Sequence, residues 1–303
     1  MKNSDVTQST PLAGIRYFIP ADGYVLTGRD GRVNILWDTG LPIPILEEDF
    51  SSVENSGAPD YDMVGRGIYQ ALRLNPDCVN AAEYAELLKD AYPHIISELG
   101  GQIIMLDAKE VDTPYLDRKI NFLKIMALLD PNNAGLCREI ARTFTEKGSR
   151  LSTLHQAVTS WYSAEKYLKK ALGLDPGDRH AAYEYGEALY VLGRYDQAAE
   201  AWSELLPGLE TGEEKARVSA RIAAILAGKQ PLVPPVDYLT ALAVAVEQHH
   251  IGRNDDAAAI IEDVLADQVF AEQFPLDEIY YLLGNCYQEM GMMEEAAQAF
   301  KRS

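Results

Sequence analysis

Apolar side chains recur at two different spacings along this chain, and the two spacings predict two kinds of secondary structure. Residues 15–19, 24–27 and 33–37 are short apolar runs rich in β-branched and aromatic side chains, which is typical of strands. Asp-Gly pairs in the turns between these runs favour tight hairpins. Residues 38–60 carry several glycines and prolines and predict an irregular connector.

From about residue 61 onward the apolar positions recur with the spacing of amphipathic helices. The breaks between these helices carry glycine, Asn-Pro or Asp-Pro, all of which end a helix. The sequence therefore predicts a mainly α-helical protein with a small N-terminal β-hairpin segment.

Two short patterns recur within the helical part. An Ala-Leu-x-Leu sequence followed by Asn-Pro or Asp-Pro occurs at 71–76 and 171–176, and a close variant occurs at 126–131. A glycine followed by an Ala-Ala pair a few residues later occurs at 193–199, 252–258 and 291–297. Recurrence of this kind indicates a repeat architecture, in which each unit is one pair of helices.

These patterns resemble the tetratricopeptide repeat, a helix–turn–helix unit of about 34 residues. The best copy runs from Arg179 to about Gly212, a weaker one starts near Tyr238, and the last starts near Asp277. In the best copy the positions that follow the family's order are Tyr185, Gly186, Leu189, Gly193, Tyr195, Ala198 and Trp202. Glu210 replaces the family's closing proline. The resemblance implies a right-handed α-solenoid of stacked helix–turn–helix repeats.

Close packing between the two helices of a unit accounts for the small residues. We expect Gly186 to face Ala198 in the best copy, so that the two helices nest. Gly284 and Ala296 are expected to do the same in the last copy. The aromatic side chains of each second helix would then fill the space toward the next unit.

The boundaries of the regions follow from where these patterns begin and where they fail. We predict a flexible lead and a small β-hairpin segment over residues 1–60, degenerate repeats or a helical cap over 61–133, and a repeat array over 134–303. The turn after Gly148 is lengthened, and residues 213–237 lack the repeat pattern, so we expect the array to be irregular in its middle.

The resemblance also implies a binding groove. In this family the partner usually lies on the concave face, which is lined by first-helix side chains that are not used for packing. Carried over by register, these positions are His180, Tyr183, Glu184, Glu187, Tyr190, Val246, His249, His250, Tyr281, Asn285 and Gln288, with Leu239, Leu242 and Leu282 beside them. The predicted function is that of a non-catalytic adaptor or scaffold, which holds a protein or peptide segment in this groove.

Charge narrows the choice of partner. The chain carries 46 Asp and Glu against 27 Lys and Arg, a net charge of −19, so it repels nucleic acid and anionic membrane surfaces. Some family members bind the C-terminal carboxylate of chaperones, but Tyr183 and Glu187 occupy the matching positions, and an acidic groove would repel a carboxylate. We therefore expect a basic or apolar protein segment as the partner.

The location of the protein is inferred from its apolar segments and its cysteines. No apolar run is long enough to cross a membrane, and the first residues lack the apolar stretch of a signal peptide, so we expect a cytoplasmic protein without membrane insertion. Cys78, Cys137 and Cys286 lie far apart and include no CxxC pair. We expect three buried helix cysteines in a reducing compartment, rather than a disulfide framework or a metal site.

The catalytic motifs are weak. Asp38-Thr39-Gly40 resembles the loop of aspartic proteases, but that chemistry needs a second aspartate within a β-rich domain. Residues 33–42 also look like the opening strands of metallo-β-lactamase-fold hydrolases, yet no HxHxDH zinc motif follows. His249 and His250 are adjacent on a predicted helix, where their side chains diverge and do not chelate one ion well. We therefore expect no catalytic residue, no metal and no cofactor.

Two alternatives to the adaptor remain open. One is a hydrolase-like or ligand-binding N-terminal module, whose substrate the repeats recruit. The other is a self-assembling structural protein, with a homodimer formed through the C-terminal repeat.

Overall fold

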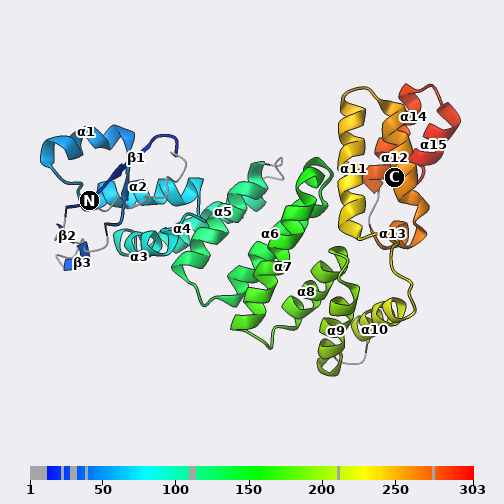
Figure 1. Cartoon of the computed structure of the whole chain (residues 1–303), viewed down its shortest axis with the longest axis horizontal. Coiled ribbons are helices and arrows are strands. Elements are labelled where there is room, and N and C mark those ends of the chain that lie inside the picture. The colour runs from blue at the N-terminus through cyan, green and yellow to red at the C-terminus, as the bar shows by residue number, and fades with distance from the viewer. Residues whose placement is uncertain are drawn as a thin grey trace, which may run out of the picture. The chain divides into compact units, whose positions relative to one another are not determined.

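A computed structural model of the chain describes residues 12–21, 24–27, 33–37, 40–108, 114–209, 212–274 and 277–303 (Figure 1). The chain divides into two compact units, Met1–Asn132 and Asn133–Ser303. The described residues are mainly helical, with short antiparallel strands near the N-terminus. The predicted fold class is confirmed.

The N-terminal unit begins with two pairs of antiparallel strands. β2 (Tyr24–Thr27) and β3 (Val33–Trp37) form a hairpin, whereas β1 (Ile15–Phe18) pairs with β4 (Ile43–Leu46). The predicted strands over residues 15–19, 24–27 and 33–37 are confirmed, and β2 and β3 form a hairpin. The expectation of a hairpin between the first two runs is wrong, because β1 pairs with β4.

The expectation of an irregular connector over residues 38–60 is wrong for part of that stretch. β4 lies there, and the helix α1 (Glu47–Ser56) follows it directly. Ile43 and Ile45 are fully buried, so tertiary packing holds this segment extended in spite of its prolines. Pro44 is tolerated because the sheet that contains β4 has only two strands.

Four further helices complete the N-terminal unit. They are α2 (Tyr61–Leu74), α3 (Ala81–Ala91), α4 (Ile95–Asp107) and α5 (Pro114–Leu129). α2 crosses β4 so closely that a Cβ on Gly67 would lie 1.9 Å from the carbonyl oxygen of Pro44. Only glycine fits at this crossing.

The C-terminal unit is a series of helical hairpins. In chain order its elements are α6 (Ala134–Ser149), the 3-10 helix η1 (Leu151–Gln156), α7 (Ala157–Leu174), α8 (Arg179–Val191), α9 (Tyr195–Leu205), the 3-10 turn η2 (Leu206–Gly208), α10 (Glu213–Leu226), α11 (Pro235–His250), α12 (Asn254–Ala266), α13 (Gln268–Gln273), α14 (Asp277–Glu289) and α15 (Met293–Phe300). The pairs α6/α7, α8/α9, α11/α12 and α14/α15 pack together as hairpins. Each hairpin is a helix–turn–helix unit of the predicted kind.

Glycines on the first helix of a hairpin lie under aromatic rings of the second helix. A Cβ on Gly186 would lie 2.1 Å from Nε1 of Trp202, and a Cβ on Gly284 would lie 2.4 Å from the ring of Phe300. We expected these glycines to face Ala198 and Ala296, but the nearest neighbours of the missing Cβ atoms are the aromatic rings. The rings lie one helical turn further along the second helix and cover the glycines.

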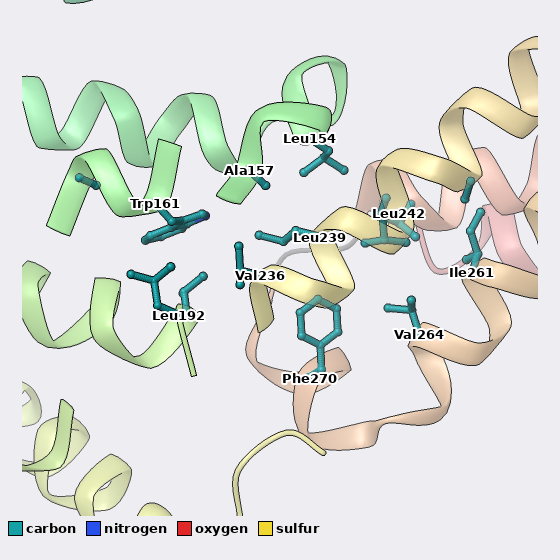
Figure 2. Close-up of a cluster of buried hydrophobic side chains, with 14 of the residues drawn as sticks. Leu154, Ala157, Trp161, Leu192, Val236, Leu239, Leu242, Ile261, Val264 and Phe270 are labelled. Carbon is teal, nitrogen blue, oxygen red and sulfur yellow. The ribbon is translucent and has the colours of Figure 1, made fainter. Parts of the chain in front are cut away.

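Between α10 and α11 the helices stop packing in chain order. α10 packs on α9, and its Val218, Ile222 and Ile225 belong to the same hydrophobic cluster as Trp202. α11 instead packs on η1 and on α7. Figure 2 shows Val236 and Leu239 of α11 among side chains of the earlier hairpins, beside Trp161 and Leu192.

A buried carboxylate fixes the connector between α10 and α11. Asp267 follows α12, and its two oxygens accept four hydrogen bonds. The donors are the backbone N–H of Leu232 at 2.7 Å, the hydroxyl of Tyr238 at 2.8 Å, and the backbone N–H groups of Val269 at 3.0 Å and Phe270 at 3.2 Å. Asp267 therefore caps α13 and also fixes the connector that leads into α11.

The cysteines differ in their surroundings. Cys137 and Cys286 are buried in α6 and α14, but Cys78 is half-buried in the turn between α2 and α3, so the expectation of three buried helix cysteines is wrong for Cys78. All three are free thiols, and burial raises the pKa of each. No helix in the described part of the chain is long and apolar enough to cross a membrane.

Candidate protein-binding surface

A row of charged side chains crosses three helices of the C-terminal unit. We call it the charged row, and it consists of Arg138, Arg142, Glu184, Glu187 and Arg221. α6 contributes its first two members, α8 the two glutamates and α10 the last arginine. α6 precedes α7, α8 precedes α9, and α10 follows α9, so we count all three as first helices of successive repeats.

Ion pairs join the three helices through this row. Arg142 Nε lies 4.0 Å from Glu184 Oε1, and Arg221 Nη1 donates to Glu187 Oε1. Arg138 donates through Nη1 to both oxygens of Asp178, the N-cap of α8, at 2.9 and 3.1 Å. Each carboxylate of α8 on this face therefore has an arginine from a neighbouring helix beside it.

Glu184 is the least satisfied member of the charged row. Burial raises the pKa of its carboxyl group, and Arg138 and Arg142 only partly offset the rise. Within the described part of the chain, its Oε2 is buried and has no hydrogen-bond partner. Because it is closed to solvent, an external donor does not reach this oxygen in this conformation.

Aromatic rings lie beside the charged row. Tyr183 stacks on Trp202 with ring centroids 6.3 Å apart, and the Arg221 guanidinium lies 5.1 Å from the ring centroid of Tyr190 and 5.4 Å from that of Trp202. Cations attract aromatic faces at these distances. Burial raises the pKa of Tyr183 and of Tyr190.

The predicted groove residues of α8 share one face, but they differ in access. His180 is exposed, and Tyr183, Glu184 and Glu187 are half-buried. Tyr190 is only 3% exposed, and its hydroxyl donates to Oε1 of Gln273 in α13 at 2.6 Å. The ring of Tyr190 therefore belongs to the hydrophobic cluster beneath the row, whereas the other four side chains are at least partly exposed.

The predicted groove residues of α11 and α14 form a second set. Val246, His249 and Asn285 are half-buried, whereas His250, Tyr281 and Gln288 are exposed. His249 Nδ1 lies 2.7 Å from Asn254 Oδ1, and the Tyr281 ring lies against Phe300 with centroids 5.6 Å apart. Leu239, Leu242 and Leu282 are buried in the core.

The arginines of α6 and α10 were missed because the groove was inferred from α8, α11 and α14 alone. Arg221 lies 34 residues after Glu187, so the repeat period places the two side by side on neighbouring first helices. The step from Arg142 to Glu184 is longer, at 42 residues, because η1 lengthens the turn after α6. The period would therefore have predicted Arg221 but not Arg142.

A hollow lies where η1 meets α11 and α14. It has a volume of about 390 Å³, and its apolar lining is Leu151, Leu154, Leu239, Leu242, Phe274 and Ile279. Here the lengthened turn after α6 lies against first-helix positions of the later repeats. The inference from sequence placed Leu239 and Leu242 in a groove but did not foresee that η1 would form one of its walls.

The residues named for the catalytic alternatives are described only in part. Asp38 and Thr39 lie outside the described residues. Within the residues that are described, no three His, Cys, Asp or Glu side chains gather as a group that could hold a metal ion. His249 and His250 have ring centroids 6.2 Å apart.

Two segments of the chain match models of the tetratricopeptide repeat, over residues 151–209 and 277–303. These segments contain η1 to η2 and α14 to α15, where glycines lie under Trp202 and Phe300. The fold is thus that of a helical-repeat protein. Residues 151–209 and 277–303 therefore carry tetratricopeptide repeats, which serve in scaffolds for protein–protein interaction.

Solved structures of low sequence identity resemble the chain. MamA from Desulfovibrio magneticus RS-1 is 12% identical, over 69% of this chain and 92% of that one, with a TM-score of 0.30. A tetratricopeptide repeat protein from Parabacteroides merdae is 15% identical, over 84% and 89%, with a TM-score of 0.26. The human IFIT1 dimer with PPP-AAAA is 13% identical, over 84% and 65%, with a TM-score of 0.32. No curated protein matched the chain.

Proposed function

We propose that the chain is a non-catalytic scaffold, which holds a segment of a partner protein against the charged row. The observation that carries this proposal is the largely exposed guanidinium of Arg142, which lies beside the half-buried carboxylate of Glu184. One group is an acceptor and the other a donor, and both belong to first helices of the repeats. Stacked repeats present their first helices as an extended binding surface.

The chemistry of the row suits the backbone of an extended peptide. A backbone N–H can donate to Glu184, and a neighbouring carbonyl can accept from Arg142. The ring of Tyr183 provides a flat apolar wall for a side chain of the same peptide. Recognition in this form uses main-chain hydrogen bonds for affinity and adjacent side-chain contacts for specificity.

The charges of the row alter the expected partner. A groove lined by Glu184 and Glu187 alone would select a basic segment, but arginines lie beside both carboxylates. We therefore propose a segment that is polar or of mixed charge where it meets the row. The net charge of −19 still favours a partner whose overall charge is positive, through long-range attraction.

The test is affinity capture from an extract of the native host, with the chain as bait. Arg142→Glu removes the donor and places like charges together, so we expect the captured partner to fall by about tenfold or more, which corresponds to about 1.4 kcal/mol. Lys169→Glu is the matched control, because it makes the same change in charge at an exposed position of α7. The measurement is quantitative mass spectrometry of the retained proteins.

A charge swap separates recognition from mere folding. Arg142→Glu combined with Glu184→Arg keeps an ion pair between α6 and α8 but exchanges donor and acceptor. We expect the swapped chain to keep the melting temperature of the unmodified chain and still to lose the partner. Equal retention of the same proteins by the unmodified, Arg142→Glu and swapped chains would show that the partner binds elsewhere.

We also propose that α14 and α15 form a homodimer contact. Tyr281 is 57% and Met293 is 62% exposed, and the two lie on consecutive helices of one hairpin. Met293→Glu is expected to halve the mass measured by light scattering, because a buried charge opposes association. Phe300 is less suitable for this test since its ring covers Gly284 inside the repeat. A monomeric mass for the unmodified chain removes the dimer proposal.

A further inference from the structure

The hollow between η1, α11 and α14 combines an apolar floor with an acidic rim. Its floor consists of side chains of the hydrophobic core and its margin, such as Leu154, Leu242 and Ile279. Its rim carries the charged side chains Glu146, Arg150, Asp277 and Glu278. The hollow is therefore amphipathic, which is typical of sites that bind one side chain together with its flanking charge.

The rim has a net negative charge. Arg150 Nη2 lies 2.8 Å from Glu146 Oε1, so the positive charge of the rim is already engaged by one of the three carboxylates. Asp277 and Glu278 are exposed, and they stand in the first turn of α14. A cation at this rim would meet two carboxylates within one turn of helix.

The size of the hollow limits its occupant. About 390 Å³ lies near the lower end of the range of ligand pockets, which is about 300–1,000 Å³. Such a volume suits one or two side chains rather than a whole helix. The apolar floor favours an aliphatic or aromatic side chain, since burying it removes apolar surface from water.

We propose that this hollow receives one large apolar side chain of a peptide partner whose neighbouring residue is a lysine or arginine, held by Asp277 and Glu278. This inference rests on the proposed scaffold function and names a second anchoring site for its partner. The charged row binds backbone groups, whereas the hollow selects an apolar residue next to a cation. The two sites differ in the chemistry that they recognise and are tested separately.

Blocked dipeptides provide the probe, and methyl resonances of leucine and isoleucine provide the readout. Acetyl-Leu-Arg-amide is titrated into the full chain with ¹³C-labelled methyl groups, and the shifts of Leu151, Leu242 and Ile279 are followed. We expect saturable shifts at these methyls. Acetyl-Leu-Gln-amide and acetyl-Ala-Arg-amide, which lack the cation or the large side chain, are each expected to bind about fivefold or more weakly.

Two variants separate the charged rim from general effects. Asp277→Asn/Glu278→Gln is expected to remove the preference for the arginine peptide while the leucine contact persists. Asp255→Asn/Asp256→Asn is the matched control, because it neutralises an exposed acidic pair in the first turn of α12, away from the hollow. The control should leave both affinities unchanged. Ser149→Trp places an indole at an exposed position of the lining and should abolish the shifts.

The outcomes distinguish this site from the charged row. An absence of shifts at these methyls with the arginine peptide at up to about 10 mM, a range that covers millimolar dissociation constants, overturns the proposal. Equal binding of the Arg and Gln peptides overturns the role of the rim. If capture of the native partner stays sensitive to Arg142→Glu in either case, the scaffold proposal stands and only this second site is lost.

Discussion

Replacing Trp202 by alanine is expected to lower the free energy of unfolding of the C-terminal unit by about 3–5 kcal/mol. The indole is fully buried, and it lies directly over Gly186 of α8. Its Nε1 donates to the carbonyl oxygen of Tyr183 at 3.2 Å. Alanine would leave a cavity between α8, α9 and α10 and a carbonyl without its donor. Urea unfolding followed by circular dichroism measures the loss.

The converse change tests whether the glycine and the indole act as a pair. Gly186→Ala inserts a methyl group into the ring, and overpacking of this kind costs about 1–3 kcal/mol. Gly173→Ala is the matched control, because a Cβ there meets no atom within 4 Å. The control should be neutral or stabilising, since alanine favours a helix over glycine by about 1 kcal/mol.

A double-mutant cycle completes the argument. Trp202→Leu shortens the second side chain, so Gly186→Ala should cost much less in that background than in the unmodified chain, with a coupling of about 1–2 kcal/mol. Additive costs would show that the glycine matters for some reason other than the indole above it. In that case the account of how the two helices nest is incorrect.

The repeat architecture could be predicted because its constraints are local. In the copies that start near Arg179 and Asp277, the first helix contains a glycine and ends at a second one, and the second helix carries an aromatic residue at the matching position. The order of the elements therefore follows from sequence alone. The identity of the neighbour of Gly186 did not follow, because several small and large side chains of α9 lie within one turn of each other. Only the packed structure shows that Trp202 is the one above it.

Other features depend on contacts between distant segments and left little trace in the sequence. β4 is extended because Ile43 and Ile45 are buried, although Pro44 between them argues against a strand. α11 stacks on η1 and α7 rather than on α10, its predecessor in the chain. The hollow with the acidic rim exists only because of this stacking. Periodicity within a segment contains no information about which distant segment it will meet.

Removing the carboxylate of Asp267 is expected to loosen this stacking. Asp267→Ala removes the acceptor of the N–H of Leu232, the hydroxyl of Tyr238 and the buried N–H of Phe270, and it also removes the cap of α13. Loss of these hydrogen bonds and of the cap together costs about 2–4 kcal/mol. Asn133→Ala removes a comparable but exposed cap, that of α6, and should cost about 1 kcal/mol. Both values are measured by urea unfolding.

The pH dependence of this effect identifies the charge as its source. Burial by itself raises the pKa of Asp267, but the four hydrogen bonds outweigh it, so the pKa is lowered. Burial, together with the hydrogen bond to Asp267, raises the pKa of Tyr238 to about 12. A carboxyl group with a lowered folded pKa contributes stability above its unfolded pKa of about 3.9, and this contribution is lost as the pH falls through the folded value.

The comparison that isolates this contribution is between the unmodified chain and Asp267→Asn, because acid also protonates the other carboxylates of both chains. We expect the difference in unfolding free energy to be constant at about pH 6–7 and to shrink below about pH 4. A difference that stays the same down to about pH 3 would mean that the shape of the side chain matters rather than its charge. The connector into α11 would then be held by packing around Asp267, and the hollow would keep its form in acid.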